Sequence, residues 1–352
     1  MTPDSSKPPR KRRPYSTGDV DLDTRIHALV DEVAEKDRDL VFEIITTAVR
    51  LARDETSRLD RKIANSALKE MRYAFRVFAP YRNERKVSVF GSARTCADDP
   101  EFQAAREFSR AIAERGWMVV TGAGPGIMEA AQEGAGGARS FGVNIRLPFE
   151  AKANPFIADD PKLINFKYFF TRKLMFIKEG DAFVLLPGGF GTLDEAFELL
   201  TLIQTGKSDL HPIVLLDHEG GHFWQGFDHF VRTELLNRGY VSPDDLQLYK
   251  RAAHIDEAVA EIERFYRNYH SQRVVRGKFV LRLQRLPSAD RIHELSKEFS
   301  DIFVGGTIEV ADPTPEEVRD DDALDKPRLA FAFDRMHFGR LRQLIDRLNE
   351  DE

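Results

Sequence analysis

The segment Ala182-Phe-Val-Leu-Leu-Pro-Gly-Gly-Phe-Gly-Thr-Leu-Asp-Glu195 decides the fold class of this chain. Its first five residues, Ala182 to Leu186, form a continuous apolar run, which is typical of a strand buried on both faces. A glycine-rich turn follows, and the apolar spacing then predicts a helix from Leu193 to about Ile203. A buried strand that leads through glycines into a helix indicates a parallel sheet of the α/β class.

The glycine-rich turn is a candidate phosphate site. Glycines let the backbone approach a ligand closely, and free N–H groups at the start of a helix attract an anion. The turn supplies four candidate contacts, Gly188, Gly189, Gly191 and Thr192. It lacks the lysine of a P-loop, which argues against a nucleoside triphosphatase. The alternative is that these glycines serve only the tight packing of strand and helix.

Thr192 and Glu195 allow two interpretations. Their spacing is that of a helix capping box, with threonine at the N-cap and glutamate three residues later. In the other interpretation, Glu195 is a functional carboxylate in the first helical turn beside the phosphate, where the helix dipole keeps it ionised. It would then act as a base or face a developing cation.

Two further strand-to-helix turns lie upstream. Val87–Phe90 is a predicted strand that runs into Gly91 and Ser92. Trp117–Val120 is a second predicted strand, and the turn after it offers the candidate contacts Gly122, Gly124, Gly126, Met128 and Glu129. The glycine spacing there is GxGxG and not the GxGxxG of a dinucleotide site, so NAD is poorly supported. Two glycine turns at strand ends fit better with one mononucleotide held across a crevice.

The alternation of strands and helices continues along the chain. We expect the remaining helices over 99–114, from 127, over 171–178, 222–237 and 256–269, and the remaining strands over 141–145, 163–166 and 212–216. This order predicts a Rossmann-like parallel sheet with helices on both faces. In such sheets, ligands bind beyond the carboxyl ends of the strands, where the glycine turns lie.

The chain divides into four predicted parts. Residues 1–20 read as a disordered basic tail, whose run Lys7 to Arg13 either contacts nucleic acid or is simply solvated. Apolar residues at helical spacing predict a helical extension over 21–85. The Rossmann-like domain spans 86–272, and a small α+β appendage spans 273–352.

The appendage has a predicted β-α-β-β-α order, with residues 312–326 as a loop. That order suggests a ferredoxin-like or ACT-like domain. Because the appendage carries no recognisable catalytic cluster, we expect its removal after Arg273 to leave the candidate site intact and to disturb assembly or regulation.

Composition excludes several classes of protein. No apolar run approaches the roughly 18–20 residues that span a bilayer, and no signal peptide is apparent, so the sequence predicts a cytoplasmic protein without a membrane partner. Cys96 is the only cysteine, which excludes an intrachain disulfide and a multi-cysteine metal site. The nine histidines lack ligand spacing, so no metal is expected. A net charge of −6 argues weakly against nucleic acid as a partner.

Arg172 and Lys173 occupy consecutive positions of the predicted helix 171–178. Neighbouring helical residues point about 100° apart, so one of the two side chains could face the crevice while the other faces water. The alternative is a surface arginine in a weak ion pair.

Taken together, these motifs resemble those of the Lonely Guy (LOG) family, once widely labelled "possible lysine decarboxylase". The family signature PGGxGTxxE is complete over Pro187 to Glu195, its arginine-lysine pair matches Arg172-Lys173, and its glycine turn matches Gly122 to Glu129. The similarity covers roughly residues 86–270. The helical front and the tail after 273 are additions that the small plant-type members lack.

The resemblance implies a Rossmann-like fold, a homodimer or higher homo-oligomer, and phosphoribohydrolase activity. Such an enzyme cuts a nucleoside 5′-monophosphate, here AMP or an N6-modified AMP, into free base and ribose 5-phosphate. Glu195 and Arg172 would be the catalytic pair, and the turn Gly189 to Thr192 would hold the phosphate. A carboxylate can stabilise the oxocarbenium-like cation and deprotonate water. Glu129 is a candidate proton donor for the leaving base.

No cofactor is expected. Lysine decarboxylation normally needs pyridoxal phosphate on a lysine Schiff base, and nothing around Lys173 supports that beyond its being a lysine. Two alternatives remain open: a non-catalytic carrier of a nucleotide or pterin cofactor, and a sensor whose appendage binds a second ligand. An intact Arg172 and Glu195 count against a pure carrier.

Overall fold

The computed structural model describes residues 15–146 and 153–350. Most of the predicted basic tail therefore lies outside the described residues. The chain divides into two compact units, residues 1–69 and 70–352. Across the described residues, no helix combines the length and the apolar character that crossing a membrane requires. The predicted cytoplasmic location stays a prediction.

The first unit consists of the predicted amphipathic helices, α1 (Val20–Val33), α2 (Arg38–Arg53) and the first half of α3 (Arg58–Phe78). It has a small core of its own, in which Phe42 packs against Ile26 and Val30. The division between the two units falls within α3 and not at the predicted boundary after residue 85. The second half of α3 belongs to the second unit because Ala74 and Phe78 are buried in the core of the large sheet.

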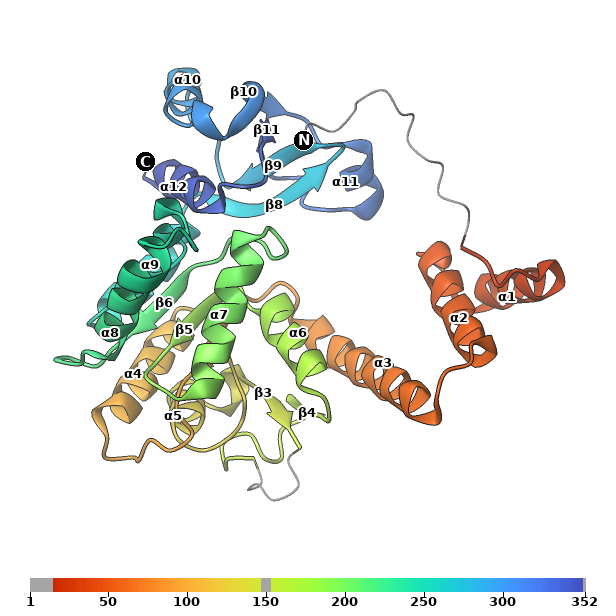
Figure 1. Cartoon of the computed structure of the whole chain (residues 1–352), viewed down its shortest axis with the longest axis horizontal. Coiled ribbons are helices and arrows are strands. Elements are labelled where there is room, and N and C mark those ends of the chain that lie inside the picture. The colour runs from red at the N-terminus through yellow and green to blue at the C-terminus, as the bar shows by residue number, and fades with distance from the viewer. Residues whose placement is uncertain (1–14, 147–152, 351–352) are drawn as a thin grey trace. The chain divides into compact units, whose positions relative to one another are not determined.

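The second unit contains a seven-stranded parallel sheet, which confirms the predicted α/β class (Figure 1). Its strand order is β4-β3-β2-β1-β5-β6-β7. The strands are β1 (Lys86–Phe90), β2 (Met118–Thr121), β3 (Ser140–Ile145), β4 (Leu163–Phe166), β5 (Ala182–Leu185), β6 (Ile213–Leu216) and β7 (Lys250–Ala252). Only β7 was not predicted, because it has three residues and begins with Lys250 and Arg251.

Helices cover both faces of this sheet, and the strands divide their side chains between two cores. On β5, Ala182 and Val184 face one core, while Phe183 and Leu185 face the other. The first core also contains residues of α4 (Pro100–Glu114), α5 (Ile127–Ala135) and α9 (Ile255–Phe265). The second also contains residues of α6 (Phe169–Glu179), α7 (Phe190–Gln204) and α8 (Phe223–Phe230).

The strand order creates a switch point between β1 and β5. Successive strands run outward from β1 through β2 and β3 to β4, and outward on the other side from β5 to β6 and β7. Beyond the carboxyl ends of β1 and β5, the chain continues to α4 on one face and to α7 on the other. The crevice expected at such a switch point is where ligands bind in this class of fold. The turns after both strands are among the predicted glycine turns.

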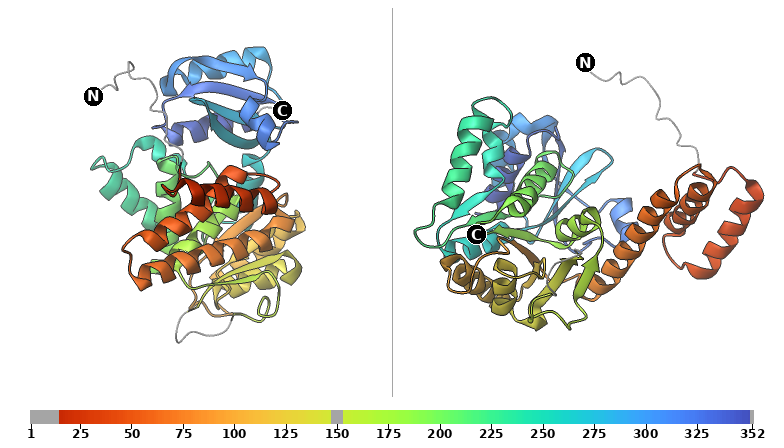
Figure 2. Two further views of the ribbon diagram at one scale, coloured as in Figure 1. Left: turned by 90° about the vertical axis from the view of Figure 1, so that its right-hand side faces the viewer. Right: turned by 60° about the horizontal axis from the view of Figure 1, so that its bottom comes forward.

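The C-terminal region forms a separate four-stranded antiparallel sheet of order β10-β11-β9-β8, visible in both views of Figure 2. Its strands are β8 (Tyr269–Val275), β9 (Lys278–Leu283), β10 (Phe303–Ala311) and β11 (Arg328–Phe333), and its helices are α10 (Ala289–Glu298), α11 (Pro315–Asp320) and α12 (Phe338–Asn349).

The predicted order of the appendage needs two corrections. Tyr269–Val275 is a strand, paired with β9 through a tight turn in which Arg276 and Gly277 both have positive φ. The predicted loop contains α11, which begins with Pro315 and has a capping box formed by Thr314 and Glu317. The strands and main helices thus follow a β-β-α-β-α-β-α order, and not the β-α-β-β-α-β order of ferredoxin-like domains.

The appendage and the parallel sheet share one continuous core. Leu344 and Leu348 of α12 belong to the same buried cluster as Phe265 of α9. The side-chain oxygen of Asn349 accepts hydrogen bonds from the backbone N–H groups of Asn268, at 2.8 Å, and Tyr269, at 2.9 Å. Removal of the chain after Arg273 would expose this core. We therefore no longer expect such a truncation to leave the candidate site intact.

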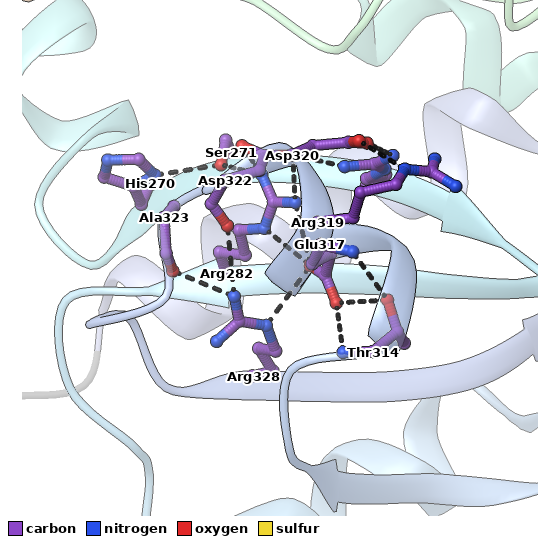
Figure 3. Close-up of polar contacts among 11 residues, drawn as sticks. His270, Ser271, Arg282, Thr314, Glu317, Arg319, Asp320, Asp322, Ala323 and Arg328 are labelled. Carbon is purple, nitrogen blue, oxygen red and sulfur yellow. Dashed lines mark hydrogen bonds and ion pairs between the residues drawn. The ribbon is translucent and has the colours of Figure 1, made fainter. Parts of the chain in front are cut away.

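A fully buried carboxylate ties α11 to the sheet of the appendage (Figure 3). Glu317 Oε1 accepts from Arg282 Nη2 of β9 at 2.8 Å and from Arg328 Nε of β11 at 3.2 Å. Its other oxygen accepts from the backbone N–H of Thr314 at 2.9 Å. Burial opposes the charge, but these hydrogen bonds outweigh it and lower the pKa of Glu317 to about 2.

We predict that Glu317→Gln destabilises the protein by about 3–5 kcal/mol, because it removes the carboxylate that two buried guanidinium groups share. Arg282 keeps its ion pair with Asp322, so most of the loss falls on Arg328. Urea denaturation at neutral pH measures this free energy of unfolding. The matched control is Glu309→Gln, whose ion pair with Lys278 leaves both side chains 58% exposed and should contribute little. Equal effects of the two substitutions would contradict the prediction.

Candidate active site

The three predicted glycine turns meet at the backbone of Ser92. The N–H of Ser92, after β1, donates to the carbonyl oxygen of Pro187, after β5, at 3.1 Å. The carbonyl oxygen of Ser92 accepts from the N–H of Ile127, the first residue of α5, at 3.0 Å. Segments that are far apart in the sequence are thus joined at the switch point of the sheet.

The glycines of these turns have two different roles. A Cβ atom on Gly188 would lie 2.1 Å from Thr192 Oγ1, one on Gly126 would lie 2.4 Å from the carbonyl oxygen of Ser92, and one on Gly91 would strike Ile127 at 2.6 Å. Glycine is required at these positions for packing. A Cβ on Gly189 or Gly191 would meet no atom within 4 Å. Their backbone borders open space, as close approach of a ligand requires.

The capping-box interpretation of Thr192 and Glu195 is wrong. Helix α7 begins at Phe190 with Gly189 as its N-cap, three residues before the predicted start. Thr192 is therefore the third helical residue, and Glu195 lies in the second turn. The N–H groups of Phe190, Gly191 and Thr192 have no acceptor within the helix, since an α-helix leaves its first N–H groups unpaired. The amino-terminal end of α7 is thus available to an anion.

The amino-terminal end of α5 lies at the same crevice. Its N-cap is Gly126, and Met128 and Glu129 lie in its first turn. Met128 packs over Gly122 and Gly124, since a Cβ on either glycine would lie 2.7 Å from an atom of the Met128 side chain. Among the described residues, no hydrogen bond or ion pair joins Glu129 to Glu195. A proton donor for the leaving base need not touch the catalytic carboxylate, so the role of Glu129 stays a prediction.

Arg172 extends from α6 to β3 and to the glycine turn after β2. Its Nε donates to the carbonyl oxygen of Val143 on β3 at 2.9 Å, and its guanidinium lies 5.3 Å from the ring centre of Phe176. A Cβ on Gly122 would lie 2.4 Å from Arg172 Nη2, so the glycine makes room for the guanidinium. Arg172 is therefore a partly buried arginine that packs against the glycine turn after β2.

Glu195 is buried, with 9% of its surface exposed, and its carboxyl group faces the two cations of α6. Burial raises the pKa of Glu195 to about 7, although Lys173 and Arg172 act in the opposite direction. This corrects the expectation that the helix dipole keeps Glu195 ionised. The dipole acts mainly on the first turn, and Glu195 lies one turn further in.

Lys173 is the site residue whose contacts sequence reasoning missed. Its Nζ lies 2.5 Å from Glu198 Oε2, 2.9 Å from Asp194 Oδ2 and 3.6 Å from Glu195 Oε2. Burial alone would lower the pKa of Lys173, but the bonds to Glu198 and Asp194 outweigh it and raise the pKa. The only signal in the sequence was the spacing of Asp194 and Glu198, four residues apart on either side of Glu195.

A separate hollow of about 460 Å³ lies near the amino-terminal end of α4 and the carboxyl end of β6. Its lining includes Asp98, Glu107, Asp217, His218 and His254. Within the described part of the chain, none of the predicted site residues lines this hollow. The crevice at Ser92 and the hollow are thus different places on the carboxyl edge of the sheet.

The crevice combines features suited to acid–base chemistry on an anionic ligand. Two helices begin at the glycine turns joined by Ser92, the guanidinium of Arg172 is held by Val143, and the pKa of Glu195 is about 7. A carboxyl group with this pKa is present in both its protonated and its ionised form at pH 7, so it can give or accept a proton.

We predict that Glu195→Gln stabilises the protein, and more so at pH 8 than at pH 5. Because the folded state holds the Glu195 proton more tightly than the unfolded chain does, stability falls as the pH rises from about 4.5 to about 7. At about 1.4 kcal/mol per pKa unit, the loss above pH 7 amounts to about 3 kcal/mol. The glutamine variant avoids it.

The free energy of unfolding in urea, compared at the two pH values, measures this difference. Glu263→Gln is the matched control, because its ion pair with Arg115 is exposed. If the gain from Glu195→Gln were the same at both pH values, the raised pKa would be refuted.

Comparison with known proteins gives a consistent result. The family model described as "Possible lysine decarboxylase" matches residues 127–262. A cytokinin riboside 5′-monophosphate phosphoribohydrolase of Mycobacterium tuberculosis is 35% identical over 173 residues, which covers 46% of this chain and 89% of that protein. A protein of the same name from Arabidopsis thaliana is 35% identical over 92 residues, which covers 26% of this chain and only 41% of that protein.

Among solved structures, the molybdenum cofactor binding protein of Rippkaea orientalis is 20% identical, with a TM-score of 0.37. The match covers 51% of this chain and 96% of that one.

Proposed function

This chain belongs to the Lonely Guy family, and from that premise we propose that it is a phosphoribohydrolase. Its substrate would be a nucleoside 5′-monophosphate, AMP or an N6-modified AMP, and its products free base and ribose 5-phosphate. The observation that carries the proposal is the buried Glu195 beside Arg172, at a crevice bordered by two helix amino termini. Relatives with the name of this activity support it.

The 5′-phosphate binds at the start of α7 in this proposal. The open backbone at Gly189 and Gly191 and the unpaired N–H groups of the first turn fit a phosphate group. Thr192 packs against Gly188, which keeps the turn closed behind the ligand. The binding energy of the phosphate then holds the ribose C1′ near Glu195.

Glu195 and Arg172 act on the glycosidic bond. Cleavage of the C1′–N bond develops positive charge on the ribose, and the ionised Glu195 stabilises that charge and accepts a proton from water. Arg172, fixed by the carbonyl oxygen of Val143, binds substrate oxygens or orients Glu195.

The geometry of Lys173 argues against a decarboxylase. A lysine that forms a Schiff base must lose its proton, which requires a lowered pKa. Lys173 is held by Glu198 and Asp194, and its pKa is raised. Its amino group is therefore protonated and engaged.

We also propose that the protein forms a homodimer or higher homo-oligomer. Phe170 and Leu174 of α6, and Phe190 and Phe197 of α7, are exposed apolar residues, and Phe190 is 94% exposed. Self-association would bury such side chains. No nucleic acid and no membrane partner is expected.

We predict that Glu195→Gln abolishes release of the base and that Arg172→Ala impairs it severely. The first substitution removes the charge but keeps the shape, and the second removes a fixed guanidinium. Chromatography of AMP and N6-modified AMP reactions measures the free base, and circular dichroism verifies folding. Near-normal activity of Glu195→Gln would refute the mechanism. A wild-type protein that binds AMP but releases no base from any nucleotide would support the carrier alternative.

We predict that AMP is hydrolysed at least about two orders of magnitude faster than adenosine in kcat/KM. The loss corresponds to about 3 kcal/mol of transition-state stabilisation, which is reasonable for several charge-assisted hydrogen bonds to the phosphate. Inorganic phosphate or ribose 5-phosphate should compete with AMP. Equal kcat/KM values for adenosine and AMP would remove the phosphate from the start of α7.

A further inference from the structure

The proposed reaction needs two proton transfers at the glycosidic bond. The leaving base must receive a proton, and the attacking water must lose one. Glu129, in the first turn of α5, stays a predicted donor, and the buried Glu195 is a second candidate. The charged groups that act on Glu195 are Lys173 and Arg172 of α6 and Glu198 and Asp194 of α7.

Lys173 divides its charge unequally among three carboxylates of α7. The shortest contact is with Glu198, the next with Asp194, and the longest, 3.6 Å, with Glu195. The side chains are 31%, 64% and 11% exposed in the same order. Glu195, the most buried of the three carboxyl groups, is therefore the one farthest from the Lys173 ammonium.

This distribution follows from the helical positions. Asp194 and Glu198 are four residues apart, so they lie one above the other on α7 and both reach Lys173 of the adjacent α6 (Figure 1). Glu195 is the next residue after Asp194, so its side chain leaves the helix about 100° away from that of Asp194. Lys173 therefore makes its two shorter contacts with Glu198 and Asp194 and its longest contact with Glu195.

We propose that Lys173 is a positioning residue, held by Glu198 and Asp194 at a distance from Glu195 that lets this single carboxyl group first donate and then accept a proton. The proposal rests on the phosphoribohydrolase function. It names the proton donor that the reaction requires.

The proton balance closes on Glu195 alone. In the first step, the protonated carboxyl group gives its proton to a ring nitrogen of the base while the C1′–N bond breaks, and the bonding electron pair leaves with the base. This step leaves a carboxylate facing the oxocarbenium-like cation. In the second step, water forms a bond to C1′ and passes a proton to the carboxylate. One water is consumed, and Glu195 returns to its protonated state.

The electrostatic setting agrees with this double role. Burial, Glu198 and Asp194 raise the pKa of Glu195, Lys173 and Arg172 lower it, and the balance lies near 7. A full ion pair with Lys173 would lock Glu195 in the ionised form, and the absence of any cation would lock it in the protonated form.

The test measures the Glu195 titration directly, by ¹³C NMR of glutamate-labelled protein, with Glu195→Gln to assign the signal. Lys173→Gln should raise the pKa of Glu195 by about one unit because it removes a cation, and Lys173→Arg should restore it. Glu198→Gln should lower the pKa by about one unit because it removes a negative charge and frees Lys173. The control Glu263→Gln should leave the pKa unchanged.

The pH dependence of kcat/KM provides the second measurement. If the first proton transfer limits the rate, activity falls as the pH rises through the pKa of Glu195. Lys173→Gln should move this fall to higher pH and Glu198→Gln to lower pH. Comparison among variants cancels the titration of the substrate phosphate.

Two results would overturn the proposal. One is a pKa of Glu195 that is unchanged in both Lys173→Gln and Glu198→Gln, with the proteins folded. The other is an activity that rises with pH through this pKa, since Glu195 would then act only as a base. Failure of the proposed function is distinguishable from failure of this inference. A wild-type protein that releases no base contradicts the function, whereas the NMR shifts of the variants test the role of Lys173 independently of turnover.

Discussion

Two hydrogen bonds of the Ser92 backbone hold the turns after β1 and β5 and the start of α5 in one place. Three chain segments can approach so closely only where side chains are missing, which explains the glycines at 91, 126 and 188. The same contact aims the amino-terminal ends of α5 and α7 into one crevice. The arrangement of α6 then matters, because this helix brings Arg172 and Lys173 to the crevice from the side.

Burial of the Glu195 carboxyl group is unfavourable for stability and useful for chemistry. A carboxyl group in water is ionised at neutral pH, whereas Glu195 retains a proton for part of the time. Lys173 and Arg172 of α6 lower the pKa of Glu195, and Glu198 and Asp194 of α7 raise it. The charge of a single group is therefore determined by the packing of two helices.

Much of the fold was predictable from local patterns. The strand 182–186 and the glycine turns after β1, β2 and β5 carry their signals in consecutive residues. The structure contains this strand and places each of these turns at the carboxyl end of a strand, although α7 begins inside the predicted turn 187–192. Short or polar elements were missed: β7 and β8 were not predicted, and α11 lies in a segment predicted as a loop. The start of α7 was predicted three residues too late because the glycines from Gly188 to Gly191 disfavour a helix locally. In the structure, Thr192 packs on Gly188 and the helix begins at Phe190.

The candidate site was only partly predictable, because several of its contacts depend on packing between segments that are far apart in the sequence. Arg172 and Glu195 were predicted from the motif. The contact of Arg172 with Gly122 and the three contacts of Lys173 depend on how α6 packs against its neighbours, which the sequence motif does not encode. The titration of Glu195 near pH 7 is likewise a property of its burial and not of its position in the motif.

The shared core of the parallel sheet and the appendage has a consequence for biosynthesis. A ribosome delivers α12 after every other described element, yet Leu344, Leu348 and Asn349 complete the surroundings of Phe265 and Tyr269. The nascent chain therefore carries the finished motif of the crevice long before its core can close. A chain interrupted ahead of α12 exposes these apolar side chains to chaperones and to other nascent chains.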